Sequence, residues 1–165
     1  MKYLLLALTF TCTMLNAATD IYLAGPLFTL AEREFNAKLA QGLRERNLTV
    51  FLPQETEVRE LTSSSIFAND VNGVDQAKVV VAIFDGPDPD SGTCWECGYA
   101  YAKGKPIIAV RTDFRNISDG GLAPYNLMLW ESAKEKVELS SLFSDLPSIV
   151  NAVVKSFQSV EVPQL

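Results

Sequence analysis

An unbroken apolar run in the middle of the chain constrains the fold more than any other feature of the sequence. It comprises residues 79–84, Val-Val-Val-Ala-Ile-Phe, and follows Lys78. A strand without polar side chains must be buried on both faces, which is typical of the centre of a parallel sheet. Parallel strands are joined by crossover connections that place helices over the sheet. The run therefore predicts an α/β fold with helices on both faces of the sheet.

The flanking sequence alternates between short apolar segments and helical patterns, as such a fold requires. Further strands are predicted at 21–24, 49–52, 106–111 and 136–139. Helices are predicted at 28–46, 63–76, 93–104 and 140–158. Ser63–Ser65 can cap the second of these helices, and its spacing turns Ile66, Val71 and Val74 inward. At 165 residues the chain has the size of a single domain.

The first 18 residues have a different character. Lys2 precedes about a dozen apolar or small residues, which end in Asn16-Ala17-Ala18. This order is typical of a secretory signal peptide, and the stretch is too short for a membrane-spanning anchor. A buried first element of the domain is the alternative. We expect residues 19–165 to form the working domain, periplasmic or secreted if the segment is cleaved and cytoplasmic otherwise.

Charge and histidine content exclude several kinds of function. The chain carries 14 basic and 20 acidic residues, a formal charge of −6. Binding to a nucleic acid polymer needs clustered Lys and Arg, so no such partner is expected. The sequence contains no histidine, which removes Ser-His-Asp triads and His-ligated metal sites, and we predict no metal centre. The chemistry must therefore use carboxylates, thiols or hydroxyls.

The most unusual acidic segment follows the central strand. Ligands of open parallel sheets bind beyond the carboxyl ends of the strands. Asp85, Asp88 and Asp90 lie there, and Glu96 follows in the next helix. The helix N-terminus is expected to keep Glu96 ionised, which suits a nucleophile, and a like-charged neighbour is expected to make Asp90 a proton donor. The alternatives are turn residues at 85 and 88, a helix cap at 90 and a first-turn glutamate at 96.

Two further features leave alternatives open. Asp70 lies mid-helix among poor helix formers, where it either faces a site or is simply exposed. Cys94 and Cys97 have the spacing of a redox dithiol. A structural disulfide and two buried thiols are the other interpretations of this pair, and the buried thiols are favoured.

Several segments, in this order, resemble the nucleoside 2-deoxyribosyltransferase family. They are residues 21–28 (IYLAGPLF), 69–75 (NDVNGVD), 90–100 (DSGTCWECGYA), 104–106 and 124–128. The resemblance implies a flavodoxin-like three-layer sandwich with a mainly parallel five-stranded sheet. It also implies transfer of a 2-deoxyribosyl group between nucleobases, through a covalent glutamyl-sugar intermediate and without a cofactor. The partners would be small-molecule deoxyribonucleosides and free bases.

The resemblance also assigns roles to single residues. Glu96 would be the nucleophile, Asp90 would protonate the departing base, and Tyr22 would orient the nucleophile. The implied substrate-binding residues are Asp70, Gly25, Phe28, Asn126, Met128 and either Gln54 or Glu57. Asn126 and Met128 would reach into a neighbouring subunit's site, so a homo-oligomer is expected. Phe28 and Trp95 are candidates for stacking on the base, although core packing is their favoured role.

Other functions remain open at this point. An N-glycosidase would use the same glutamate and pass the sugar to water, acting on deoxyribonucleosides or their 5'-monophosphates. The loop at 25–29 offers few donors for a phosphate, which favours nucleosides. A non-catalytic nucleoside-binding module, or a redox protein using Cys94 and Cys97, would belong to a different class.

Overall fold

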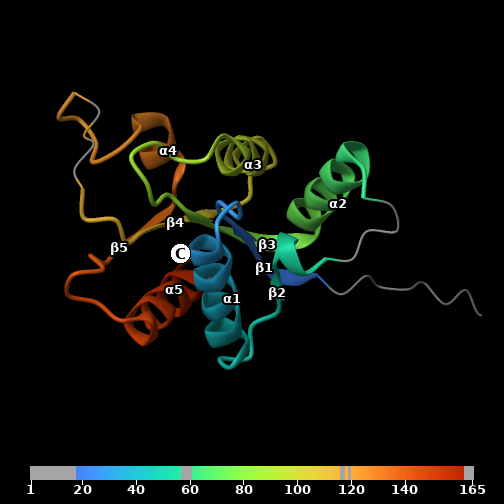
Figure 1. The fold of residues 1–165 in the computed structure, drawn as a ribbon, viewed down its shortest axis with the longest axis horizontal. Helices are drawn as coiled ribbons and strands as arrows, with labels where there is room; N and C mark the ends of the chain where they lie inside the picture. Colours follow the sequence, from blue (N-terminus) through green and yellow to red (C-terminus); the bar gives the residue numbers. More distant parts are fainter. Residues whose placement is uncertain (1–17, 57–60, 116–117, 119, 162–165) are drawn as a thin grey trace, which may run out of the picture.

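The computed structural model describes residues 18–56, 61–115, 118 and 120–161, and these form one three-layer α/β unit (Figure 1). The strands are β1 (Thr19–Ala24), β2 (Val50–Phe51), β3 (Ala77–Ile83), β4 (Ile107–Arg111) and β5 (Glu135–Glu138). They form a five-stranded sheet in the order β2-β1-β3-β4-β5, and each neighbouring pair is parallel. The predicted flavodoxin-like fold class is confirmed.

Helices cover both faces of this sheet. The helices are α1 (Leu30–Arg44), α2 (Ser63–Gln76), α3 (Ser91–Ala102), α4 (Leu127–Ser132) and α5 (Leu146–Glu161), with a short 3-10 helix, η1 (Pro53–Glu55). Figure 1 shows α1 and α5 below the sheet and α2, α3 and α4 above it. The prediction of a central strand is also confirmed, because β3 is buried along its length except at Lys78.

Alternation along the strands creates two separate cores. Successive residues of a strand point to opposite faces of a sheet. From β1, Ile21 and Leu23 join a core with α1 and α5. Tyr22 and Ala24 point the other way and join a core with α2 and α3. The register of β1 therefore places the Tyr22 side chain on the face that α3 covers.

Side-chain caps set where the helices begin. Thr29, Thr62, Asp90 and Asn126 each accept a hydrogen bond from a backbone N–H in the first turn of α1, α2, α3 and α4. These bonds satisfy N–H groups that have no partner inside the helix. The cap of α2 is therefore Thr62 and not the predicted serines. At α3, the alternative interpretation of Asp90 as a cap is confirmed.

Two sequence predictions are wrong in detail. The last helix begins at Leu146 instead of residue 140, after a turn in which the Asp145 carboxylate accepts a bond from the Ser148 backbone N–H. Ile66 was expected to face inward but is 42% exposed. Only the C-terminal end of α2 is fully buried, at Gly73 and Val74. There Gly73 lies against Phe51, whose ring would be 2.7 Å from an added Cβ.

The predicted signal peptide cannot be compared with the structure, because residues 1–17 lie outside the described part of the chain. None of the helices in the described ranges has both the length and the hydrophobicity that crossing a bilayer requires.

Candidate active site

Tyr22 and Glu96 lie 74 residues apart in the chain and meet between β1 and α3. Tyr22 Oη donates a hydrogen bond of 2.5 Å to Glu96 Oε1. The Tyr22 side chain is fully buried, and its ring stacks on Phe51 with 5.3 Å between centroids. Burial, followed by the negative charge of Glu96, raises the pKa of Tyr22, so the phenol keeps its proton. Tyr22 is therefore a fixed donor that orients the Glu96 carboxyl.

Glu96 is held in surroundings that oppose its negative charge. Burial raises the pKa of Glu96 to about 7, with further contributions from Asp70 and Asp90, while the Tyr22 hydrogen bond acts in the opposite direction. The expectation that the helix N-terminus keeps Glu96 ionised is thus corrected. Glu96 is the sixth residue of α3 and lies beyond the first turn, where the helix dipole acts, so loss of hydration is the main influence on its pKa. Near neutral pH Glu96 is present in both protonation states.

A cavity of about 530 Å³ lies between α2 and α3, and we call it the α2–α3 groove. Its lining residues are Ser63, Ile66, Phe67, Asp70, Gly92, Trp95 and Glu96. Asp70 and Glu96 are the acidic members of this set. Asp70 is partly buried and accepts a bond from the neighbouring Asn69 amide, at 3.2 Å. Burial raises the pKa of Asp70. The groove therefore brings together two carboxyl groups that resist ionisation.

The acidic loop after β3 has a mainly structural role. Asp90 Oδ2 accepts bonds from the Thr93 backbone N–H at 2.8 Å and the Thr93 hydroxyl at 3.0 Å. Asp85 accepts from Thr112 N–H at 2.6 Å, Thr112 Oγ1 at 2.5 Å and Asp113 N–H at 2.9 Å. Neither Asp85 nor Asp90 lines the α2–α3 groove. These two carboxylates instead fix the ends of the loop.

The other predicted substrate-binding residues do not line the groove. Gly25 directly follows β1, and an added Cβ there would lie 3.1 Å from Ile83. Phe28 is 76% exposed and Met128 is 71% exposed. The Asn126 side chain is used as the cap of α4.

Gln54 and Glu57, the two candidates for the base-binding position, differ in what the structure describes. The Gln54 amide nitrogen donates to the Arg33 carbonyl at 2.8 Å. The Gln54 Oε1 atom is buried and has no hydrogen-bond partner among the described residues. Glu57 lies outside the described residues. Gln54 Oε1 can therefore accept a hydrogen bond from a further donor group.

The aromatic residues differ from the sequence predictions. Trp95 is 47% exposed, so neither Trp95 nor Phe28 has the core-packing role that the sequence favoured. Phe67 was missed altogether, and it contacts Trp95 edge-on with 5.2 Å between centroids. A signal for Phe67 exists in the sequence, because residues 63, 66, 67 and 70 share one helical face.

The two cysteines do not form a disulfide. Cys97 is buried and Cys94 is partly buried, and both are free thiols. Burial raises the pKa of each thiol, and nearby negative charges act in the same direction. Redox dithiols need a lowered pKa, so this environment favours the interpretation as two simple thiols. Within the described ranges, no cluster of three or more Cys, Asp or Glu side chains is arranged to hold a metal ion.

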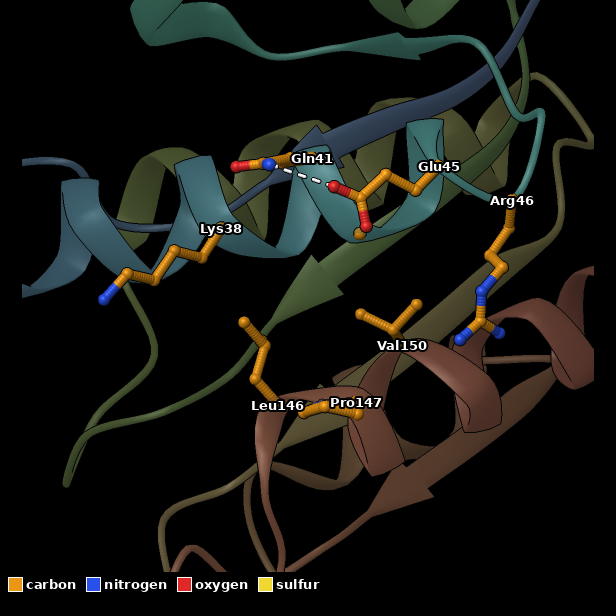
Figure 2. Close-up of a pocket in the computed structure, with 8 residues that line it drawn as sticks. Lys38, Gln41, Glu45, Arg46, Leu146, Pro147 and Val150 are labelled. Atoms are coloured by element: carbon orange, nitrogen blue, oxygen red, sulfur yellow. Dashed lines mark hydrogen bonds between the residues drawn. The ribbon is translucent and has the colours of Figure 1, made fainter.

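A second hollow lies on the opposite side of the sheet, between α1 and α5 (Figure 2). Its volume is about 250 Å³. Figure 2 shows the Gln41 amide donating to Glu45, at 2.9 Å, with Val150 facing α1 from α5. None of the predicted site residues lines this hollow. The α2–α3 groove is therefore the candidate active site.

Comparisons with known proteins identify the family of this chain. A family model described as nucleoside 2-deoxyribosyltransferase matches residues 21–146. A nucleoside deoxyribosyltransferase of Lactobacillus leichmannii is 29% identical over 80 residues, and this aligned part covers 48% of this chain and 48% of that enzyme.

Two solved structures are similar over most of their length. A 2-deoxyribosyltransferase of Bacillus psychrosaccharolyticus has a TM-score of 0.63 and 29% identity, covering 84% of this chain and 96% of that one. A conserved protein of Enterococcus faecalis has a TM-score of 0.65 and 28% identity, with coverages of 85% and 99%.

Proposed function

Because this chain belongs to the nucleoside 2-deoxyribosyltransferase family, we propose that it cleaves the N-glycosidic bond of 2'-deoxyribonucleosides and transfers the sugar to another base. The observation that carries the proposal is the Glu96 carboxyl, oriented by Tyr22 at 2.5 Å and facing a cavity large enough for a nucleoside base. Nucleoside and base are the partners, and no cofactor enters the reaction.

The reaction proceeds in two displacements at the anomeric carbon. Tyr22 holds Glu96 Oε1, so Oε2 is the attacking atom. Its electron pair forms a bond to C1', and the bond between C1' and the base nitrogen breaks with its electron pair going to the base. A second base then attacks C1' through a ring nitrogen, and the bond between C1' and Oε2 breaks with its electron pair returning to the Glu96 carboxylate. The proton of the incoming base passes to the carboxylate that protonated the first base. Two inversions give overall retention, as in retaining glycosidases.

We propose that Asp70 donates the proton that the departing base needs. The resemblance pointed to Asp90 for this role, but the Asp90 oxygen that is bound by Thr93 caps α3. Asp70 lines the same groove as Glu96, and burial raises the pKa of Asp70. A carboxyl group with a raised pKa keeps more of its acid form near neutral pH, which general acid catalysis requires. Asp90 then acts by fixing the first turn of α3, the helix that carries Glu96.

The remaining parts of the proposal concern binding and assembly. Gln54 has a buried acceptor atom for a base amino group, while Gly25 and Phe28 border the sugar. Met128, exposed on α4, supports the proposal that Asn126 and Met128 complete the site of a second copy. We therefore propose a homo-oligomer of the domain at 19–165, exported if the first 18 residues are cleaved.

One experiment tests the reaction. The protein is incubated with deoxyinosine and free adenine, and products are separated by chromatography. Deoxyadenosine as the main new product is expected for transfer. Deoxyribose with hypoxanthine would instead assign the protein as an N-glycosidase, since water would intercept the same intermediate. No turnover would contradict the proposal.

A second experiment tests the covalent step. A 2-fluorinated deoxyribosyl nucleoside slows breakdown of the glycosyl-enzyme, so intact mass measurement should show an increase equal to the fluorinated sugar. Peptide mapping should place it on Glu96. Turnover of the natural substrate without any adduct on this residue would rule out Glu96 as the nucleophile.

A further inference from the structure

The outer part of the α2–α3 groove is built from aromatic side chains that have no role in the reaction described above. On α2, Ser63, Ile66, Phe67 and Asp70 share one face, because they are three or four residues apart. On α3, Trp95 and Glu96 contribute to the opposite wall. On α2, Asp70 lies about one turn beyond Phe67, and on α3, Glu96 directly follows Trp95. We call the part of the groove beside Asp70 its acidic end.

Phe67 and Trp95 form a continuous apolar surface that is open to solvent. Phe67 is 56% exposed and Trp95 is 47% exposed. Their rings meet edge-on at 5.2 Å, and Trp95 also stacks on Tyr99 at 5.4 Å with an angle of 9°. These contacts fix the orientation of both rings without burying them. We call Phe67 and Trp95 the aromatic wall.

We infer that the aromatic wall binds the nucleobase and makes the enzyme select purines over pyrimidines. The inference rests on the proposed function, because Glu96 must reach C1' and the base is attached to that carbon. Every base has an apolar face that can stack on an aromatic side chain. The occupant of this wall is therefore the substrate's own base.

The position of Phe67 explains why the size of the base matters. Phe67 precedes Asp70 by three residues, which is about 4.5 Å along the axis of α2. Helical side chains also lean toward the N-terminus, which takes Phe67 further from the reacting carbon. A base protonated by Asp70 starts at the acidic end of the groove. A bicyclic purine extends from there to Phe67, whereas a single pyrimidine ring leaves part of the wall uncovered.

Equilibrium binding of free bases tests this inference independently of turnover. Calorimetry with adenine and thymine should show tighter binding of adenine. Phe67→Ala should weaken adenine binding by about 10-fold, the effect of losing one stacking contact, and change thymine binding by less than about twofold. Trp95→Ala should act in the same direction, and Phe67→Tyr should restore adenine binding. Tyr101→Ala is the matched control, because Tyr101 is a 65% exposed aromatic residue of α3 that lines a different hollow.

Other outcomes would overturn the inference or the proposed function, and they can be told apart. Thymine binding as tight as adenine binding, or no measurable adenine binding at millimolar concentration, removes the purine preference. Equal losses for both bases in Phe67→Ala show a general apolar lining without selection. Weaker self-association in sedimentation with unchanged base binding shows that a second copy covers the wall. Discriminating base binding without nucleoside turnover would contradict the proposed function alone, and turnover without discrimination would contradict this inference alone.

Discussion

Two acidic regions of the molecule, the loop after β3 and the α2–α3 groove, place carboxyl groups in opposite electrostatic environments. In the loop, Asp85 accepts three hydrogen bonds from the segment after β4. Asp113 of that segment is paired with Arg115, which holds the pKa of Asp113 well below its usual range. In the groove, burial raises the pKa of Asp70. Burial also raises the pKa of Glu96, and the negative charges of Asp70 and Asp90 act in the same direction.

The comparison shows that a high density of carboxylates in the sequence does not by itself indicate which of them have a raised pKa. Carboxylates that accept several backbone N–H bonds are stabilised in their charged form and act as structural ties. Carboxylates that are desolvated with few partners are poised near neutral pH and can attack or donate a proton. The loop should therefore respond to mutation through stability, and the groove through reactivity.

Removing the nucleophile should give the largest effect. Glu96→Ala is expected to lower kcat by at least about 1,000-fold, because a covalent route is lost when its nucleophile is removed. Initial rates of deoxyinosine cleavage measure the loss. Glu45→Gln, a change on the far side of the sheet, is the control for the loss of a carboxylate. Activity of Glu96→Ala above a tenth of the wild-type value would show that the groove is not the reaction centre.

Asp70→Asn should have the next largest effect, and the effect should depend on the leaving group. Cleavage of deoxyinosine is expected to slow by about 100-fold, the usual size of a general acid contribution. Cleavage of 7-methyl-2'-deoxyguanosine should slow much less, because its positively charged base leaves without a proton. Comparison of kcat/KM for the two nucleosides measures this difference.

The matched variant for this prediction is Asp90→Asn. If Asp90 acts through the first turn of α3, its loss should slow cleavage of both nucleosides by the same factor. Selective recovery of Asp90→Asn with the methylated nucleoside would instead make Asp90 the proton donor.

A change in the loop should affect stability instead of chemistry. Asp85→Asn removes a charged acceptor from three hydrogen bonds and should lower the free energy of unfolding by about 2 kcal/mol. Urea denaturation measures this loss. The kcat of the folded variant should stay within about twofold of wild type. A large loss of kcat at full stability would mean that the loop takes part in the reaction.

The pH dependence of the reaction rate should report the pKa of Glu96. Because Glu96 must be ionised and Asp70 protonated, the plot of kcat/KM against pH is expected to be bell-shaped, with the midpoint set by Glu96 near its pKa of about 7. The Tyr22 hydrogen bond lowers this pKa, so Tyr22→Phe should move the midpoint to higher pH. A pH–rate profile from pH 5 to 9 measures both midpoints. A midpoint that moves to lower pH in Tyr22→Phe would contradict the assigned role of Tyr22.

A separate effect is expected on stability as a function of pH. The folded-state pKa of Glu96, about 7, lies above its ordinary value of 4.5, so the folded protein holds this proton more tightly than the unfolded chain. Its contribution to stability is complete below pH 4.5 and is lost as the pH rises through about 7. Glu96→Gln should remove this loss. Thermal unfolding at pH 5 and pH 8 should therefore show a smaller difference in Tm for the variant than for wild type.

Much of the architecture was predictable because it depends on local patterns. The apolar run at 79–84 required burial on both faces, and β3 is indeed the middle strand of the sheet. Alternation of strands and helices determined the fold class. The prediction that Ile66 faces inward was wrong, because helical spacing does not show how much of a helix is covered by other elements. α2 is fully buried only near its C-terminal end.

The candidate site was predictable in part. Glu96 and Asp70 could be selected as candidates from residue type and position in their helices, and the resemblance then pointed to Tyr22. The structure added the contact between Tyr22 and Glu96, the use of Asp90 and Asn126 as helix caps, and the Phe67 side chain beside Trp95. Each of these depends on a neighbour from another element, or on which atoms a side chain already binds.

The sequence alone determined the order of strands and helices and the presence of an acidic residue early in the helix after the central strand, because hydrophobic periodicity and capping act over a few residues. Only the tertiary structure decided which carboxyl groups have a raised pKa. The pKa of a carboxyl group is set by the water that it loses and by the charges and donors that face it. For Glu96 these include Tyr22 and Asp70, which lie on other elements of the fold.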